Sequence, residues 1–140
     1  MISETRWMGL DVGSHTIGVA VSDLLGITAQ GVEVIRRKSI EQDFLRLQEL
    51  IHIHSVVGFV VGLPKNMNNT IGPQGEFSIA FAKELENRFH LPVILWDERL
   101  TSKSAEQVLL SANVQRKKRK LVIDQLAASF ILQSYLDSLR

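Results

Sequence analysis

The sequence of 140 residues has no cysteine, only three prolines and few aromatic residues, which make up 6% of the chain. The lack of cysteine excludes a disulfide framework, a thiolate metal site and a cysteine nucleophile. No apolar run reaches the roughly 18 residues of a membrane span, and the N-terminal segment lacks the apolar core of a signal peptide. We therefore expect a single cytoplasmic domain over residues 1–140, with no membrane partner.

An excess of charge of one sign is also lacking, because 16 Lys and Arg balance 15 Asp and Glu to a net charge of +1. The charges are unevenly distributed, however. Five consecutive basic residues leave 11 bases against 15 acids in the rest of the chain; they are Arg116, Lys117, Lys118, Arg119 and Lys120. Such a segment is a candidate contact for phosphate groups, and the alternative is a solvated loop or the start of a helix.

Short apolar runs separated by turn residues predict a sheet. Three strands are expected over 7–11, 17–23 and 28–35, with the short connections of an antiparallel meander. Helices and strands then alternate, with helices expected over 39–51 and 77–85 and strands over 56–61 and 92–96. A loop is expected at 66–75, and two further helices follow, one from Thr101 and one from about 121 to 139. Because strands that alternate with helices are parallel, the pattern predicts an α/β fold. Its five-stranded mixed sheet has three antiparallel strands, then parallel strands, and is flanked by helices.

Three acidic residues lie where a carboxylate is costly to bury or hard to explain by local structure. Asp11 interrupts an apolar strand just before Gly13. Glu98 follows a short buried strand, at the edge where α/β sheets bind ligands. Asp124 shares a helix face with Ala127 and Ala128, whose small side chains allow close packing on a sheet. Ordinary turn, capping or solvent-edge roles are the alternatives.

Three carboxylates, without cysteine and without two histidines at ligand spacing, favour a hard cation that prefers oxygen ligands. Mg²⁺ or Mn²⁺ fits this donor set, and zinc does not. A phosphodiester is repelled by bare carboxylates, whereas two ions about 3.5–4 Å apart would activate water and stabilise the leaving oxygen. With a basic segment to hold the backbone of a nucleic acid, the combination predicts a metal-dependent nuclease.

Four segments, in the same order, resemble the YqgF/RuvX family of bacterial proteins. They are Gly9–Gly13 with Ile17–Asp23, Val61–Thr70 with Gly72 and Gln74, Asp97–Ser102, and Asp124–Leu136. The resemblance implies a ribonuclease H-like fold, as in RuvC-type resolvases, and a Mg²⁺-dependent nuclease. Members are described both as nucleases for the 5′ end of pre-16S ribosomal RNA and as Holliday junction resolvases. The resemblance carries over Asp11, Glu98 and Asp124 as catalytic acids and metal ligands, and it implies no organic cofactor.

Two positions depart from the family pattern, which usually has Arg where this chain has Thr16 and Gly where it has Asn69. The absence of the Arg removes a phosphate contact, and His15 is a candidate replacement donor. The three acidic positions are intact.

In the expected mechanism, Asp11 bridges two metal ions, while Glu98 and Asp124 each complete the ligands on one side of the pair. Water attacks the scissile phosphate and leaves a 3′-hydroxyl and a 5′-phosphate. The basic segment 116–120 is the favoured nucleic-acid contact.

Further contacts with the substrate are expected from Lys65, Asn66 and Asn68, on the loop after the fourth strand, although these residues alternatively form turns. Arg99 either orients the substrate or pairs with Asp97. The expected partner is structured RNA or branched DNA, bound by a monomer or a homodimer.

The leading functional prediction is processing of the 5′ end of pre-16S ribosomal RNA in ribosome biogenesis. The first alternative is a Holliday junction resolvase in DNA recombination and repair. More distant alternatives are a nucleic-acid-binding module without catalysis and a nucleotide binder of the sugar-kinase or actin type. The last class clamps ATP between two such domains, and this chain has length for one.

Overall fold

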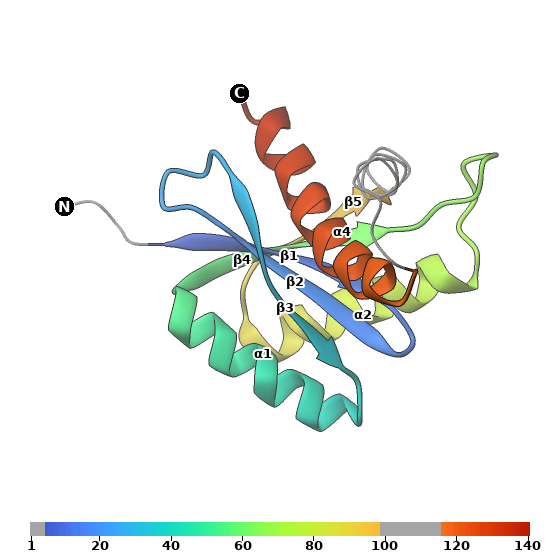
Figure 1. The fold of residues 1–140 in the computed structure, drawn as a ribbon, viewed down its shortest axis with the longest axis horizontal. Coiled ribbons are helices and arrows are strands. Elements are labelled where there is room, and N and C mark those ends of the chain that lie inside the picture. Colours follow the sequence, from blue (N-terminus) through green and yellow to red (C-terminus); the bar gives the residue numbers. More distant parts are fainter. Residues whose placement is uncertain (1–4, 99–115) are drawn as a thin grey trace.

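A computed structural model of the chain describes residues 5–98 and 116–140, except for the side chains of residues 116–125. Its elements follow the chain as an antiparallel hairpin series and then as alternating helices and strands (Figure 1). They are β1 (Arg6–Val12), β2 (Thr16–Ser22), β3 (Ala29–Arg36), α1 (Ile40–His54), β4 (Val56–Leu63), α2 (Pro73–Phe89), β5 (Val93–Asp97) and α4 (Arg116–Ser138).

The strands form one sheet in the order β3-β2-β1-β4-β5. Pairing is antiparallel between β3, β2 and β1, and parallel from β1 through β4 to β5. The predicted five-stranded mixed sheet is therefore confirmed. Because β1, β4 and β5 point the same way, their carboxyl ends share one edge of the sheet, and Asp11 and Asp97 lie near that edge.

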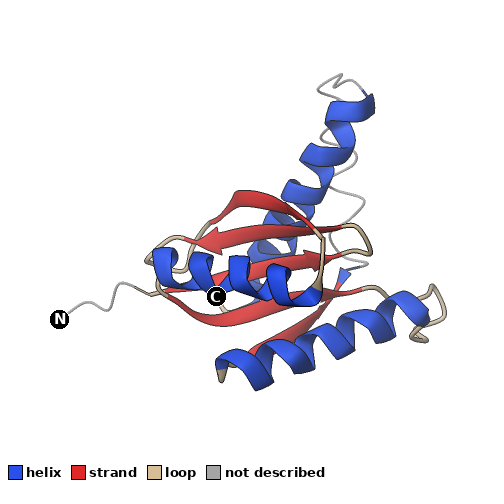
Figure 2. Cartoon of the chain, turned by 90° about the horizontal axis from the view of Figure 1, so that it is seen from below, coloured by secondary structure: helices blue, strands red, loops and turns tan. Residues whose placement is uncertain are grey.

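The two faces of the sheet are covered by different helices. On one face, α1 and α2 pack against a core that includes Leu10, Phe44 and Leu85, and Figure 2 shows these two helices lying along the sheet. On the other face, α4 packs on Ala20 and Val60. Since side chains alternate along a strand, the burial of Met8, Leu10 and Val12 on the first face places Asp11 on the face of α4.

The contact between α4 and β1 is close because Gly9 has no side chain. A Cβ atom at Gly9 would lie 2.7 Å from the Cβ atom of Leu132 and 2.8 Å from the carbonyl oxygen of Ala128. Further along α4, the ring of Tyr135 lies 5.7 Å from the ring of Trp7. The helix therefore runs along β1 in the opposite direction, from the carboxyl end of the strand toward its beginning.

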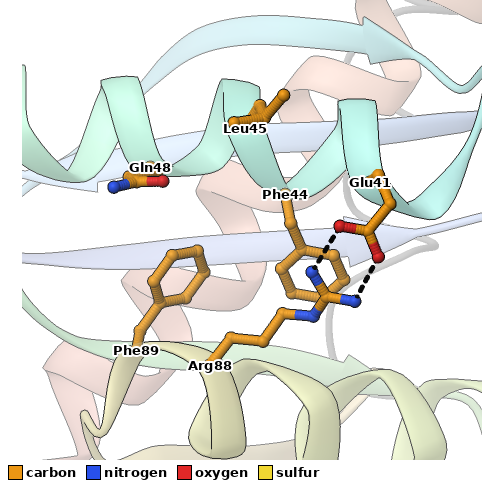
Figure 3. A pocket seen from close by; sticks show the side chains of 6 residues that line it. All are labelled: Glu41, Phe44, Leu45, Gln48, Arg88 and Phe89. Atoms are coloured by element: carbon orange, nitrogen blue, oxygen red, sulfur yellow. Dashed lines mark hydrogen bonds and ion pairs between the residues drawn. The ribbon is translucent and has the colours of Figure 1, made fainter.

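The helices α1 and α2 are joined by an ion pair at the surface (Figure 3). Arg88 donates two hydrogen bonds to Glu41, at 2.7 and 3.1 Å, and its guanidinium lies 4.6 Å from the ring centre of Phe44. The hydrogen bond from Arg88 lowers the pKa of Glu41. These side chains line a hollow between α1 and α2. It lies on the face of the sheet opposite to α4 and Asp11, so its residues take no part in the site at the edge of the sheet.

Two details of the sequence prediction need correction. The helix α4 begins at Arg116 rather than near Leu121, because Lys and Arg are good helix formers and the basic segment supplies its first turns. The helix α2 begins at Pro73, within the predicted loop, since proline suits the first turn of a helix. Phe77, in the first turns of α2, is 39% exposed, and its ring centre lies 5.2 Å from the guanidinium of Arg37.

The predicted helix from Thr101 lies outside the described residues. None of the described helices has the length and apolar character that crossing a lipid bilayer requires.

We expect Gly9→Ala to destabilise the protein by about 1–3 kcal/mol, since the added methyl group forces α4 away from β1. Urea denaturation measures this free energy of unfolding. The matched control is Gly72→Ala, where the nearest atoms to the new methyl group lie 3.5 Å away. Equal costs at the two positions would show that the close approach of α4 does not limit stability.

Candidate active site

Asp11 lies at the carboxyl end of β1, and its position is set from both sides. Its partner across the antiparallel pair is Gly18, which leaves room above the sheet on that side. The next residue, Val12, accepts a hydrogen bond from the side-chain amide of Gln74 at 3.2 Å. This bond ties the first turn of α2 to the end of β1, so the backbone that carries Asp11 is anchored.

Glu98 follows β5 directly, and a second glycine makes room for it. A Cβ atom at Gly62, near the end of β4, would lie 3.0 and 3.1 Å from the Cγ and Cδ atoms of Glu98. The Glu98 side chain therefore reaches across the end of β4 toward β1. This placement brings together two of the acids that the sequence predicts, because parallel neighbouring strands end at one edge.

The two carboxyl groups touch, and their contact is electrostatically costly. Burial raises the pKa of Glu98 to about 9, with further contributions from a side-chain hydrogen bond to Asp11 and from the charges of Asp11 and Asp97. Two ionised carboxylates have no proton to share in a hydrogen bond. One of them must therefore hold a proton, or a cation must take the place of that proton.

This donor set fits a hard divalent cation. Carboxylate oxygens are the ligands that Mg²⁺ and Mn²⁺ prefer, and the described part of the chain brings two such groups into contact without sulfur or imidazole ligands beside them. Among the residues whose side chains are described, no cluster of three acidic or histidine side chains is found. The side chain of Asp124, the third predicted ligand, lies outside that description.

The backbone of α4 nevertheless indicates where residue 124 lies. Tyr135 packs near Trp7, and Ala128 packs over Gly9, which lies two residues further along β1. Residue 124 precedes Ala128 by one helical turn, so the same progression carries it toward Asp11. Asp124 remains a predicted ligand that this geometry favours.

The loop after β4 contains three of the predicted substrate contacts, and the structure places two of them within a turn. The amide of Asn66 donates to the hydroxyl of Thr70 at 2.9 Å, and that hydroxyl donates to Asn68 at 2.6 Å. Asn66 and Asn68 thus stabilise the loop, and their contact with a substrate stays a prediction. Lys65, directly after Pro64, has a partly exposed side chain.

Asn69 lies in the same loop with φ of 69°, in the left-handed region. Glycine is the usual residue there, and Asn tolerates the conformation better than other residues. The departure from the family's Gly at this position is therefore compatible with an unchanged loop.

Other predicted contacts are not described by the structure. Arg99 lies outside the described residues, as do the side chains of Arg116, Lys117, Lys118, Arg119 and Lys120. Their roles stay predictions.

One positioning residue escaped the sequence analysis. Arg37 donates to the carbonyl oxygen of Gly13 at 3.0 Å, and its backbone N–H donates to that of His15 at 2.9 Å. Asp43, only 2% exposed, accepts a hydrogen bond from Arg37 at 2.9 Å. These bonds hold the turn that follows Asp11. The only local signal was a run of three bases, 36–38, ahead of a helix.

Comparison with known proteins identifies the family. The profile of the RuvX family, described as Holliday junction resolvase, matches residues 5–138. The chain belongs to the RuvX family. Curated relatives of this RuvX chain carry the name "Putative pre-16S rRNA nuclease". One from Listeria monocytogenes serotype 4b is 61% identical, covering 95% of this chain and 98% of the relative. One from Bacillus subtilis is 54% identical, covering 96% and 99%.

Solved structures with the same fold confirm the ribonuclease H-like architecture expected of RuvX. RuvC of Thermus thermophilus, in complex with a Holliday junction substrate, aligns with a TM-score of 0.60 at 14% identity and covers 96% of this chain and 97% of that chain. The fowlpox virus Holliday junction resolvase aligns with a TM-score of 0.54 at 15% identity, covering 96% and 99%. At these identities the likeness establishes the fold.

The contact between Asp11 and Glu98 predicts a pH-dependent stability in the presence of EDTA. Because the pKa of Glu98 in the folded chain is raised from 4.5 to about 9, the folded protein holds a proton that the unfolded chain releases. The free energy of unfolding should therefore fall as pH rises between these two values. Urea denaturation at about pH 5 and about pH 8.5 measures the change.

The matched variant is Glu98→Gln, which keeps the shape and removes the titration. It should be more stable than the parent at the higher pH and should lose most of this dependence. A parent protein with the same pH profile as Glu98→Gln would contradict the described contact.

Proposed function

We propose that this RuvX chain is a divalent-metal-dependent phosphodiester hydrolase that processes the 5′ end of pre-16S ribosomal RNA. The observation that carries the proposal is the contact between the Asp11 and Glu98 carboxyl groups at the carboxyl edge of three parallel strands. The names of the curated relatives support the RNA substrate. A cytoplasmic site of action follows from this substrate.

The residues that would hold the metal are Asp11, Glu98 and Asp124. Bound by these oxygens, Mg²⁺ or Mn²⁺ would neutralise the carboxylates and stabilise the negative charge that develops on the phosphate, and two ions fit the three-acid set. The chain's own contribution is position: Gly62 lets Glu98 approach Asp11, and Gln74 anchors the backbone next to Asp11. Such preorganisation reduces the reorganisation that the reaction requires.

In the proposed reaction, water adds to the scissile phosphorus and the bond between phosphorus and the 3′ oxygen breaks. The 3′ oxygen gains a proton, and the water oxygen stays on the 5′-phosphate. The carboxylates Asp11 and Glu98 fix the place of attack at the sheet edge. The basic segment 116–120, in the first turns of α4, holds the flanking backbone of the nucleic acid.

Cleavage of a four-way DNA junction is the second candidate function. It is favoured by the family description, Holliday junction resolvase, and by the junction substrate in the RuvC complex that shares this fold. Parallel assays on a pre-16S fragment and on a four-way junction, at equal Mg²⁺, separate the two. Faster cleavage of the junction would replace the RNA substrate and leave the metal-dependent hydrolysis in place.

We expect Asp11→Asn to reduce cleavage of the pre-16S fragment by more than about 100-fold, because the ligand charge is lost. The fold should persist, since the change removes one of two repelling carboxylates. Gel-based cleavage and thermal unfolding measure the two effects. The control is Glu86→Gln on the exposed side of α2, which should keep parental activity. Parental cleavage by Asp11→Asn would refute the assignment.

Replacement of the basic segment tests the second part of the proposal. Changing Arg116, Lys117, Lys118, Arg119 and Lys120 to Gln should weaken binding of the RNA fragment. It should also reduce the slope of the logarithm of the binding constant against the logarithm of the salt concentration. The reduction is about 0.7–0.9 for each phosphate that is no longer neutralised. Binding is measured in the Asp11→Asn background, so that cleavage does not interfere. Unchanged affinity would mean that the segment is a solvated helix start.

A further inference from the structure

A second run of basic residues, Arg36, Arg37 and Lys38, lies at the edge of the sheet that carries Asp11. Arg36 ends β3, and the run is followed by Ser39, the N-cap of α1. The three side chains differ in exposure. Those of Arg36 and Lys38 are exposed, whereas the side chain of Arg37 is only 14% exposed. The proposed function assigns no role to the two exposed bases.

The charge of Arg37 is already used within the fold. Its guanidinium donates to Asp43 and to the carbonyl oxygen of Gly13, and it lies 5.2 Å from the ring centre of Phe77. Arg37 therefore faces inward and fixes the turn between β1 and β2. Because side chains alternate along a strand, Arg36, the last residue of β3, faces the other way, while Lys38 lies at the bend before α1 and is exposed.

The strand register places Arg36 on the same face as Asp11. Asp11 pairs with Gly18 on β2, and Gly18 pairs with Val34 on β3. Two residues toward the turn, Thr16 pairs with Arg36. Steps of two residues keep the same face, so Arg36 lies on the face of Asp11, two strands away. Strand spacing and rise give roughly 12 Å between the two Cα atoms.

Lys38 extends this positive surface around the turn. Together with Ser14, Phe77 and the paired Arg37 and Asp43 it lines an open hollow of about 300 Å³ between the turn that follows Asp11 and the start of α1. Neither Arg36 nor Lys38 forms an ion pair with any residue that the structure describes. The two nearby acids of α1 and β3 are engaged elsewhere, since Asp43 binds Arg37 and Glu33 binds Arg46.

We propose that Arg36 and Lys38 bind the phosphodiester backbone of the nucleic-acid strand that enters the Asp11 edge from the side of β3. The inference rests on the proposed function and adds a second phosphate-binding surface to it, separate from the basic segment of α4. Two uncompensated positive charges next to a site for a polyanion are the complementarity that the interaction requires. The strand is thereby held on the β3 side of the carboxylates, where α1 begins.

The test compares Arg36→Gln, Lys38→Gln and the double variant, each in the Asp11→Asn background, for binding of a single-stranded pre-16S fragment at several salt concentrations. Each single change should lower affinity and reduce the salt slope by about 0.7, and the double change by about 1.4, because each base neutralises one phosphate. Thermal unfolding should be unchanged, since both side chains are exposed.

The matched control is Lys83→Gln in the same background. It removes one exposed positive charge on α2, against the opposite face of the sheet, and should leave the salt slope as it is. If the Arg36 and Lys38 variants bind like Lys83→Gln, the proposed surface is wrong. The nuclease is still supported in that case if the parent cleaves the fragment and Asp11→Asn does not. If the Asp11→Asn single variant binds no nucleic acid and the parent protein cleaves no nucleic acid, both proposals fail.

Discussion

The candidate site is built around one contact between two carboxyl groups. Asp11 and Glu98 are held within hydrogen-bonding distance in a partly buried place, where both cannot be ionised unless a cation lies between them. Such a contact costs free energy of folding, so the surrounding elements must maintain it. Two ends of parallel strands supply the acids, and two glycines allow the approach, since Gly62 admits Glu98 and Gly9 admits α4.

The two faces of the sheet support this contact in different ways. On one face, Gln74 from α2 and Arg37 from the segment before α1 bind the backbone on either side of the turn after Asp11. On the other face, α4 is fixed by apolar packing and by a hydrogen bond of 3.0 Å from the indole of Trp96 to Ser134. The site is thus built on rigid strands and clamped at its backbone, an arrangement that suits a reaction requiring fixed ligand positions.

Much of this architecture follows from local patterns. Apolar strands with short connections indicate the antiparallel series, and alternation with helices indicates the parallel pair, so the convergence of Asp11 and Glu98 at one edge could be predicted. Helix starts could not be placed as well, because the first residues of α2 and α4 are compatible with both loop and helix. Asp124 and Arg99 remain predictions, since the structure does not describe their side chains.

The roles of single side chains in a charged run were the hardest to predict. The sequence shows Arg36, Arg37 and Lys38 as equivalent bases, yet tertiary contacts direct Arg37 inward to Asp43 and leave its neighbours exposed. Patterns within one segment do not reveal such partners.

In the proposed function, a divalent cation replaces the shared proton between Asp11 and Glu98. Anomalous diffraction from crystals of the parent protein soaked in Mn²⁺ tests it most directly. We expect a manganese peak about 2.0–2.6 Å from oxygen atoms of both carboxylates. Manganese peaks found elsewhere on the molecule, with the two carboxyl groups still in direct contact, would contradict it.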